Sequence, residues 1–202
     1  MFSQLAQKLA YFFVEKNIIK SEEINIYIYG YEIMISETIN WLITIAIATF
    51  TKTLVETFVY MLTFMQLRGV LGGFHAKSHM GCIIISTIVY MQYLYIIYRT
   101  PFNLYWILIP GGILLHMVLV FVIAPVSHSN KPFINEIERM KFRNRSYRLS
   151  ILYGIVCVIL LLIPQQVLKT YSYCILLGML SASISMVVEY VKQLNSILVE
   201  GR

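Results

Sequence analysis

The chain has 202 residues and a net charge of +6; 58% of its residues are hydrophobic, 13% are charged, and the mean hydropathy is +0.72. Soluble domains carry about 25% charged residues, so this composition excludes an ordinary soluble protein and indicates an integral membrane protein. We expect residues 1–202 to form one polytopic, all-α membrane domain. The sequence has no long soluble nucleotide-binding domain and no Walker motif, which excludes an ATP-driven pump acting alone.

The N-terminal segment, residues 1–32, lacks the short apolar core and small-residue cleavage site of a secretory signal. Its apolar residues Leu5, Leu9, Phe12 and Phe13 recur at helical spacing, and the charged residues Lys8, Glu15 and Lys16 lie among or directly after them. This pattern predicts an amphipathic helix that lies on the membrane surface. Packing of the same helix against the protein's own transmembrane helices is the alternative.

Six apolar segments follow, each bounded by charged or turn residues. A transmembrane helix needs about 20 residues, so we predict about six transmembrane helices. The first two segments carry Glu37 and Glu56, and a topology of four or five spans is the alternative if one of them does not cross the membrane. The segments cover roughly residues 33–50, 53–67, 80–98, 103–124, 150–168 and 171–191.

The distribution of Lys and Arg predicts the orientation. With six spans and the N-terminus inside, 13 of the 16 basic residues lie in inner segments, and only Lys52, Arg99 and Lys169 lie outside. Lys and Arg accumulate on the cytoplasmic side of membrane proteins. We therefore expect a multi-pass protein of the cell membrane, with both termini and the 68–82 stretch on the cytoplasmic side.

The 68–82 stretch concentrates polar and reactive side chains between two apolar segments. Such groups are rare in membrane segments, because desolvating them is unfavourable unless they are paired or hydrated. A thiol, an imidazole seven residues before it and a glycine break together indicate a cysteine nucleophile with a histidine base. The residues concerned are Arg68, Gly72, Gly73, His75, His79 and Cys82.

A catalytic pair of His75 and Cys82 requires a break in the helix. Residues seven apart on a straight α-helix stand about 10.5 Å apart along its axis, whereas a base must approach its nucleophile to about 2.6–3.2 Å. The neighbouring glycines favour non-helical backbone. We expect a re-entrant catalytic loop that carries His75, with Cys82 in the first turn of the third span, where the helix dipole and an imidazole both favour thiolate.

Other interpretations of these residues stay open. In one alternative, His75 and Cys82 lie at the membrane boundary without any catalytic role. In another, His75, His79 and Cys82 bind zinc, although Ala76 stands where the metalloprotease signature H-E-x-x-H requires Glu. We expect no metal and no other cofactor. The sequence does not identify a third catalytic group. Judged by their expected depth in the membrane, the candidates are Glu32, Glu37 and Glu56.

Three further polar groups lie within apolar runs, and their surroundings indicate structural roles. Cys157 and Cys174 are expected to behave as small buried hydrophobes. His116 lies deep in the fourth span with no obvious acid beside it, so we expect it to form hydrogen bonds between helices.

Residues 125–149 form the one long polar stretch, with six Lys or Arg and two Glu. Pro125 and Pro132 end the preceding helix, and an amphipathic helix can start at Ile134. The positive charge favours inside topology and contact with anionic lipid. The alternative is a cytoplasmic docking surface for an acidic partner, with Arg143 and Arg145 among the binding residues.

Two motifs of the chain are informative together. The first motif has seven residues from Arg to His and seven from His to Cys, and it comprises Arg68, Gly72, Gly73, His75, Ala76 and Cys82. The second motif is A-P-V-S-H-S-N-K-P at residues 124–132. The first motif resembles that of the accessory gene regulator B (AgrB) family, and the second resembles the turn that follows the central span of the same family. The size and the hydropathy profile also match that family across nearly the whole chain.

The resemblance implies a membrane cysteine endopeptidase of Gram-positive quorum sensing, which releases the C-terminal tail of an autoinducing peptide precursor through a peptidyl thioester. The peptide then closes to a macrocyclic thiolactone or lactone. Cys82 would be the nucleophile and His75 the base, while Lys131 matches a basic position of the family. Site support would come from Arg68, Gly72 and Gly73.

The expected partners are an amphipathic peptide precursor with an acidic C-terminal tail, membrane lipid and a second copy of the chain in a homodimer; nucleic acid is not expected. The precursor leader would lie on the inner leaflet and deliver its scissile bond to the level of Cys82. The basic residues Lys131, Arg143 and Arg145 would receive the acidic tail. A peptide or ion transporter without proteolytic activity is the alternative function.

Overall fold

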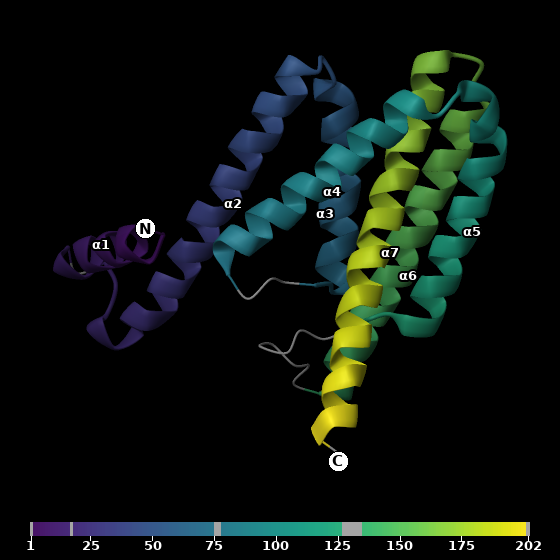
Figure 1. Ribbon diagram of the computed structural model, residues 1–202. Helices are drawn as coiled ribbons and strands as arrows, with labels where there is room; N and C mark the ends of the chain where they lie inside the picture. The colour runs from purple at the N-terminus through teal and green to yellow at the C-terminus, as the bar shows by residue number, and fades with distance from the viewer. Residues whose placement is uncertain (1, 17, 75–77, 127–134, 201–202) are drawn as a thin grey trace. The chain divides into compact units, whose positions relative to one another are not determined.

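The computed structural model describes residues 2–16, 18–74, 78–126 and 135–200, and the regular structure of these residues is entirely helical (Figure 1). Within these described ranges, six helices are long and apolar enough to cross a membrane, which confirms the predicted all-α membrane fold. In chain order the elements are α1 (Phe2–Glu15), η1 (Ser21–Glu23), α2 (Ile24–Phe50), α3 (Leu54–Leu71), α4 (His79–Arg99), η2 (Phe102–Leu104), α5 (Tyr105–Ile123), α6 (Glu136–Leu162) and α7 (Gln166–Glu200).

The helices differ from the predicted spans at several ends. Residues 24–32, which the sequence places in the N-terminal segment, already belong to α2. The polar, mostly basic segment 136–149 forms the first half of α6, and the helix continues without a break into its apolar half. The helix of the fifth span ends at Leu162, whereas the predicted span ends at residue 168. Lys, Arg and Glu also favour helices. A fall in hydropathy therefore marks where a helix leaves the membrane and not where the helix ends.

The chain forms two compact units. Unit 1 comprises Met1–Lys52 with Ala76–Gln92, and unit 2 comprises Thr53–His75 with Tyr93–Arg202. Helix α4 thus belongs to unit 1 up to Gln92 and to unit 2 from Tyr93 onward.

In unit 1 the predicted amphipathic helix is present as α1 and packs against α2. Ala6 and Ala10 are fully buried, and the Phe13 ring stacks on Tyr31 with centroids 5.9 Å apart. Leu5 and Phe12 each remain 52% exposed. One face of α1 therefore packs on the protein, while exposed apolar side chains are left for contact with a membrane interface.

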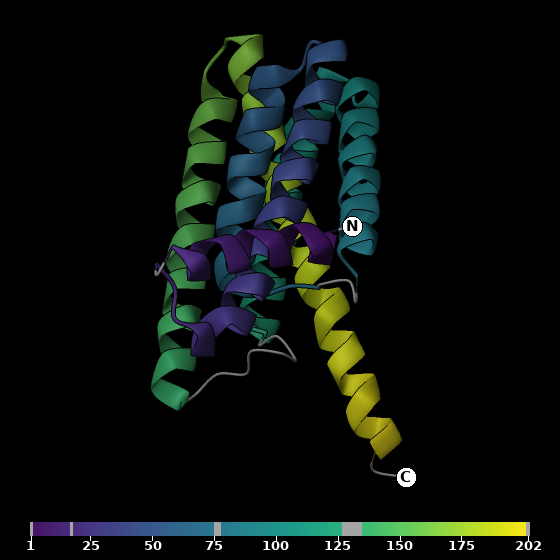
Figure 2. The same cartoon turned by 90° about the vertical axis from the view of Figure 1, so that its left-hand side faces the viewer.

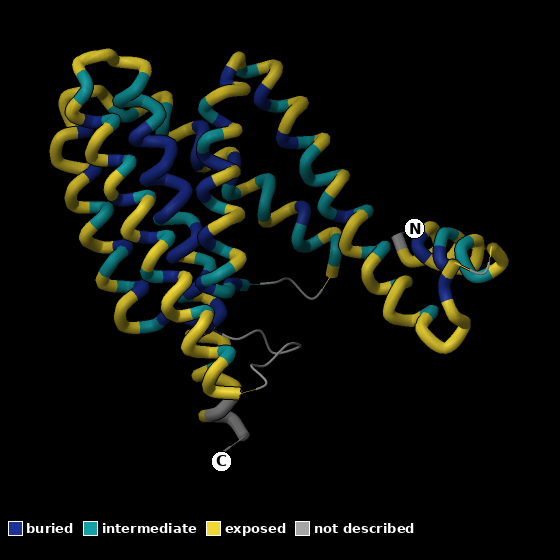
Figure 3. Tube along the Cα trace, turned by 180° about the vertical axis from the view of Figure 1, so that it is seen from behind, coloured by how far each residue is buried: buried dark blue, intermediate teal, exposed yellow. Residues whose placement is uncertain are grey.

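Helix α7 is the core of unit 2. It packs against α3, α5 and α6, and 56% of its most apolar stretch is buried, against 17–33% for the other candidate spans. Figure 3 shows a run of buried residues along this helix. The outer helices instead expose large apolar side chains such as Phe121 and Val122, which suits a surface that lipid tails cover.

Small residues allow α3 and α7 to approach closely. A Cβ added to Gly178 of α7 would stand 2.9 Å from the Tyr60 carbonyl oxygen and 2.9 Å from the Thr63 Cβ of α3. Such distances are shorter than side chains tolerate, so only glycine fits at this crossing. Close backbone approach at small residues is a main source of attraction between helices in membranes.

His116 links three helices of unit 2. Its Nδ1 lies 2.6 Å from Ser183 Oγ and 3.1 Å from the Met179 carbonyl oxygen of α7, and its Nε2 lies 2.9 Å from Ser150 Oγ of α6. The imidazole is fully buried. A buried polar group is stable when its hydrogen bonds are satisfied, and the predicted interhelical role of His116 is confirmed.

Helix α7 is longer than a membrane is thick. Its 35 residues span roughly 52 Å at about 1.5 Å per residue, whereas the hydrocarbon core measures about 30 Å. The C-terminal part continues past the ends of α3 and α5 (Figure 2). The residues that follow the last turn of α3 therefore lie against the side of α7 and not against its end.

Candidate active site

Cys82 lies in the first turn of α4, as predicted. The helix begins at His79, and the Cys82 amide donates to the Ser78 carbonyl oxygen at 3.0 Å. Ser78 caps the helix, because its Oγ accepts a hydrogen bond from the Gly81 amide at 3.1 Å. The thiol therefore lies at the N-terminal, positive end of the helix dipole.

Cys82 is the partly accessible thiol of the chain, while Cys157 and Cys174 are fully buried. The Cys157 thiol donates to the Ser172 carbonyl oxygen at 2.9 Å, and the Tyr93 hydroxyl donates to Cys174 Sγ at 3.4 Å. Both buried thiols are thus hydrogen-bonded inside the helix bundle of unit 2. Of the three thiols, only that of Cys82 is partly exposed.

Glu32 and His79 meet in unit 1. His79 Nε2 of α4 lies 3.4 Å from Glu32 Oε2 of α2, and both side chains are largely shielded from solvent. Glu32, a candidate for the third catalytic group, therefore contacts the first residue of the helix that carries Cys82.

Gly72 and Gly73 turn the chain sharply after α3. Gly72 has a φ of 78°, in the left-handed region that favours glycine. A Cβ at Gly72 would overlap the Val126 carbonyl oxygen, and a Cβ at Gly73 would stand 2.6 Å from Ser185 Oγ. The Val126 amide also donates to the Leu71 carbonyl oxygen at 2.9 Å. Both glycines are required by close packing, and their supporting role in catalysis stays a prediction.

Phe74 is held from two sides. Arg68 Nη2 donates to its carbonyl oxygen at 2.7 Å, and its amide lies 3.0 Å from the Ser185 carbonyl oxygen and 3.1 Å from Ser185 Oγ. The Arg68 guanidinium also lies over the Phe64 ring, 5.7 Å from its centroid. Arg68 therefore holds the backbone at Phe74, and its role in a catalytic site stays a prediction.

His75 and Lys131 lie outside the described residues, and so does most of the second motif, at 127–132. Cys82 belongs to unit 1 and the 68–74 segment to unit 2. The pairing of His75 with Cys82, the re-entrant loop and the role of Lys131 therefore stay predictions. Among the described residues no group of three or more His, Cys, Asp or Glu is placed to hold a metal ion, and the zinc alternative depends on His75.

Arg143 and Arg145 are exposed residues of α6. Arg143 Nε donates to the Tyr147 hydroxyl at 2.8 Å, and its guanidinium lies 5.6 Å from the centre of that ring. The helix is capped by Asn135, whose side chain accepts from the Glu138 amide at 2.8 Å. The two cations are thus displayed on a regular helix that continues into the membrane span.

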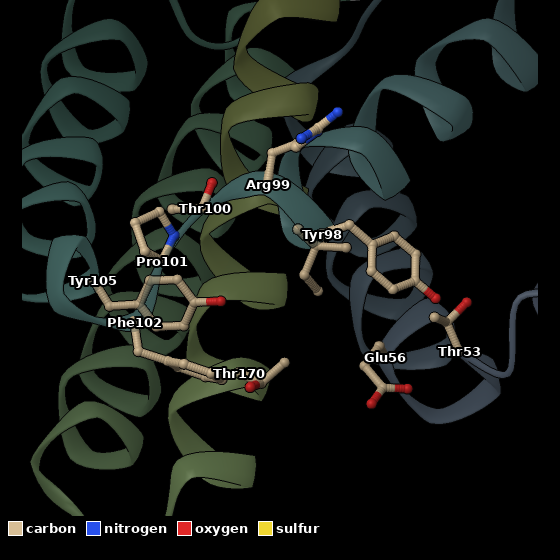
Figure 4. Close-up of a pocket in the computed structure, with 10 residues that line it drawn as sticks. Thr53, Glu56, Tyr98, Arg99, Thr100, Pro101, Phe102, Tyr105 and Thr170 are labelled. Carbon is tan, nitrogen blue, oxygen red and sulfur yellow. The ribbon is translucent and has the colours of Figure 1, made fainter.

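A cavity of about 450 Å³ lies at the opposite end of unit 2, where α3 and α5 begin and α4 ends (Figure 4). Glu56 lines this cavity together with Tyr98, and Arg99 points away from them. Glu56 precedes Arg68 in α3 by 12 residues, which corresponds to roughly 18 Å along the helix axis. Glu56 is therefore not part of the arrangement around Phe74.

Sequence reasoning missed two residues of this region, Ser185 and Glu189. Ser185 binds the Phe74 amide, and no pattern in the chain distinguishes it from the other serines of α7. Glu189 is completely buried one turn further along. It was detectable, because it is the acidic residue of the last apolar segment, and carboxylates in membrane segments are rare.

The sequence of the chain is similar to those of one protein family. The family model described as accessory gene regulator B matches residues 6–186. A putative AgrB-like protein of Listeria monocytogenes serovar 1/2a is 31% identical over 144 residues, which cover 70% of this chain and 67% of the relative. Accessory gene regulator protein B of Staphylococcus aureus is 27% identical over 158 residues, which cover 78% of this chain and 79% of the relative. No solved structure matches the chain. The match over most of the sequence shows that this chain belongs to the accessory gene regulator B family.

Proposed function

We propose that this protein is a membrane-embedded cysteine endopeptidase that removes the C-terminal tail of a quorum-sensing peptide precursor and supports cyclisation of the peptide. Family membership supports a role in accessory gene regulation. The observation that carries the chemistry is the placement of Cys82: it is the partly accessible thiol, and it lies in the first turn of a helix. A helix N-terminus and a neighbouring imidazole are known to activate thiols.

The proposed reaction has two acyl transfers. The Cys82 sulfur attacks the carbonyl carbon of the scissile peptide bond, and the thiol proton passes through His75 to the amine of the departing tail. The tail leaves with a new amino terminus, and the peptide stays on Cys82 as a thioester. An internal thiol or hydroxyl of the peptide then attacks this thioester, which closes the ring and returns the proton to Cys82.

The site needs to exclude water between these steps, because hydrolysis of the thioester would give a linear product. The 68–74 segment is packed against α7 and the 124–126 residues, which supports a rigid and shielded surrounding. We place the site on the cytoplasmic side from the distribution of Lys and Arg, and we propose that the protein acts as a homodimer.

His75→Ala is expected to abolish tail release from an amphipathic precursor, while His79→Ala keeps much of the activity, because His75 is the proposed base and His79 instead contacts Glu32. General bases contribute about 10²–10⁴-fold to rates. The assay uses purified protein in lipid and mass spectrometry of the released tail. A chelator should have no effect.

Two outcomes would contradict this assignment. Inhibition by the chelator that zinc reverses would favour a metallopeptidase. Passage of an uncleaved precursor across the vesicle membrane, with no tail released by the wild type, would favour the transporter.

Charge reversal at Arg143 and Arg145 is expected to weaken binding of a precursor with an acidic tail, because both cations are exposed at the start of α6. Exposed charge contacts are screened over about 8 Å at physiological salt. The Michaelis constant of the wild type should therefore rise with salt, and the Arg143→Glu, Arg145→Glu variant should lose most of this dependence.

A precursor with an uncharged tail is the control, and its Michaelis constant should change little in the variant. An unchanged Michaelis constant for the acidic precursor at low salt would limit these residues to topology or lipid contact.

A further inference from the structure

Glu189 is a carboxylate inside the last candidate membrane span, and its side chain is completely buried. Its Oε2 lies 3.3 Å from Lys192 Nζ, and its Oε1 accepts a hydrogen bond from Gln193 Nε2 at 3.3 Å. An ion pair of the same spacing stands on the surface of α6, between Glu136 and Arg139. Stabilising a helix therefore does not require burial, and burying a charge is unfavourable.

The surroundings of Glu189 point to Phe74. Ser185, Glu189 and Lys192 are spaced by four and three residues, so they lie on one face of α7. Ser185 binds the Phe74 amide, and Lys192 Nζ lies 5.5 Å from the centre of the Phe74 ring. The carboxylate thus lies between the two residues through which α7 contacts Phe74.

Each partner of Phe74 restrains a different part of the residue. Ser185 and Arg68 hold its amide and its carbonyl oxygen, whereas Lys192 contacts its ring through a cation–π interaction. A lysine side chain is flexible and 41% of this one is exposed. The carboxylate of Glu189 is the anion at 3.3 Å from this ammonium, and it can hold the ammonium over the ring.

We propose that Glu189 is a positioning residue of the peptidase. It fixes Lys192 over the Phe74 ring and thereby holds the backbone directly before His75, the proposed base. This inference rests on the proposed function. Phe74 directly precedes His75, so freedom gained at Phe74 is passed to the base. A displacement of about 1 Å at a catalytic group can lower a rate about 100-fold.

Glu189→Gln keeps the shape of the side chain and removes its charge. We expect kcat for tail release to fall between about tenfold and about 100-fold. The Michaelis constant should stay within about threefold of the wild type, because the proposed role of Glu189 is to position the base and not to bind substrate. Hydrogen–deuterium exchange of the peptide that carries the Phe74 amide should become faster. Exchange elsewhere in α3 and α7 should stay the same.

Glu136→Gln is the matched control, because it removes the carboxylate of an exposed pair with the same spacing; it should leave kcat and exchange at Phe74 unchanged. Lys192→Gln tests the route independently if Glu189→Gln does not fold, and it should lower kcat as well. If Glu189 acts through Lys192, the double variant should be no slower than the slower single variant.

Wild-type kcat in Glu189→Gln or in Lys192→Gln would overturn the proposal. Faster exchange throughout unit 2 would also overturn it, because Glu189 would then only stabilise the fold. Failure of the proposed function has a different signature: the wild type would release no tail, whereas exchange at Phe74 would still report whether Glu189 holds this residue.

Discussion

Cys82→Ala is expected to abolish tail release, with a rate at least about a thousandfold below that of the wild type, because loss of a nucleophile removes the covalent route altogether. The thiol lies in the capped first turn of α4 and is partly accessible. In the wild type, mass spectrometry of the intact protein should detect a peptide bound to Cys82, and hydroxylamine should remove it. The variant should carry no such adduct.

Cys157→Ala and Cys174→Ala are the controls for this result. Both thiols are buried and hydrogen-bonded within unit 2, so their loss should lower stability by roughly 1 kcal/mol each and leave the chemistry intact. Full tail release by Cys82→Ala would end the cysteine peptidase assignment. Cys82→Ser adds a further distinction, since a transporter should tolerate this change and a thiol-dependent enzyme should not.

Gly72→Ala is expected to destabilise the protein by at least about 2 kcal/mol and to remove most of the activity. The backbone at Gly72 has a positive φ, which disfavours any residue with a Cβ by about 1–2 kcal/mol. The added carbon would also overlap the Val126 carbonyl oxygen, so the chain after α3 must move. Thermal unfolding in detergent and the tail-release assay measure the two effects.

Gly69→Ala is the matched control for Gly72→Ala. Gly69 lies in the last turn of α3, and a Cβ added there meets nothing within 4 Å. Alanine favours a helix over glycine by about 1 kcal/mol, so this variant should be as stable as the wild type or more stable. Equal behaviour of the two variants would show that the turn at Gly72 does not constrain the site.

In unit 2, residues from distant parts of the chain gather around the short segment that follows α3. Phe74 is bound by Ser185, which is 111 positions away, and Gly72 is packed against Val126. Substitutions far from the 68–82 stretch are therefore expected to affect the site, and the pair Glu189 and Lys192 provides the sharpest case.

The sequence by itself determined the class of the protein and the position of its thiol. Six helices appear where six apolar segments were predicted, because insertion into lipid depends on local hydropathy and on hydrogen bonds within each helix. The first turn of α4 was predictable for the same reason: Gly81 and the polar residues before Cys82 end the apolar pattern locally. The role of His116 followed from its depth in an apolar span.

Only the tertiary structure decided which helix of unit 2 is central and which residues hold the segment 72–74. Hydropathy does not distinguish α7 from its neighbours, because lipid and protein cover apolar side chains equally well. The contacts of Phe74 with Ser185 and with Lys192 join residues more than 100 positions apart. Helix ends also escaped prediction, since α2 and α6 extend beyond their apolar segments; backbone hydrogen bonds continue there, whereas hydropathy does not.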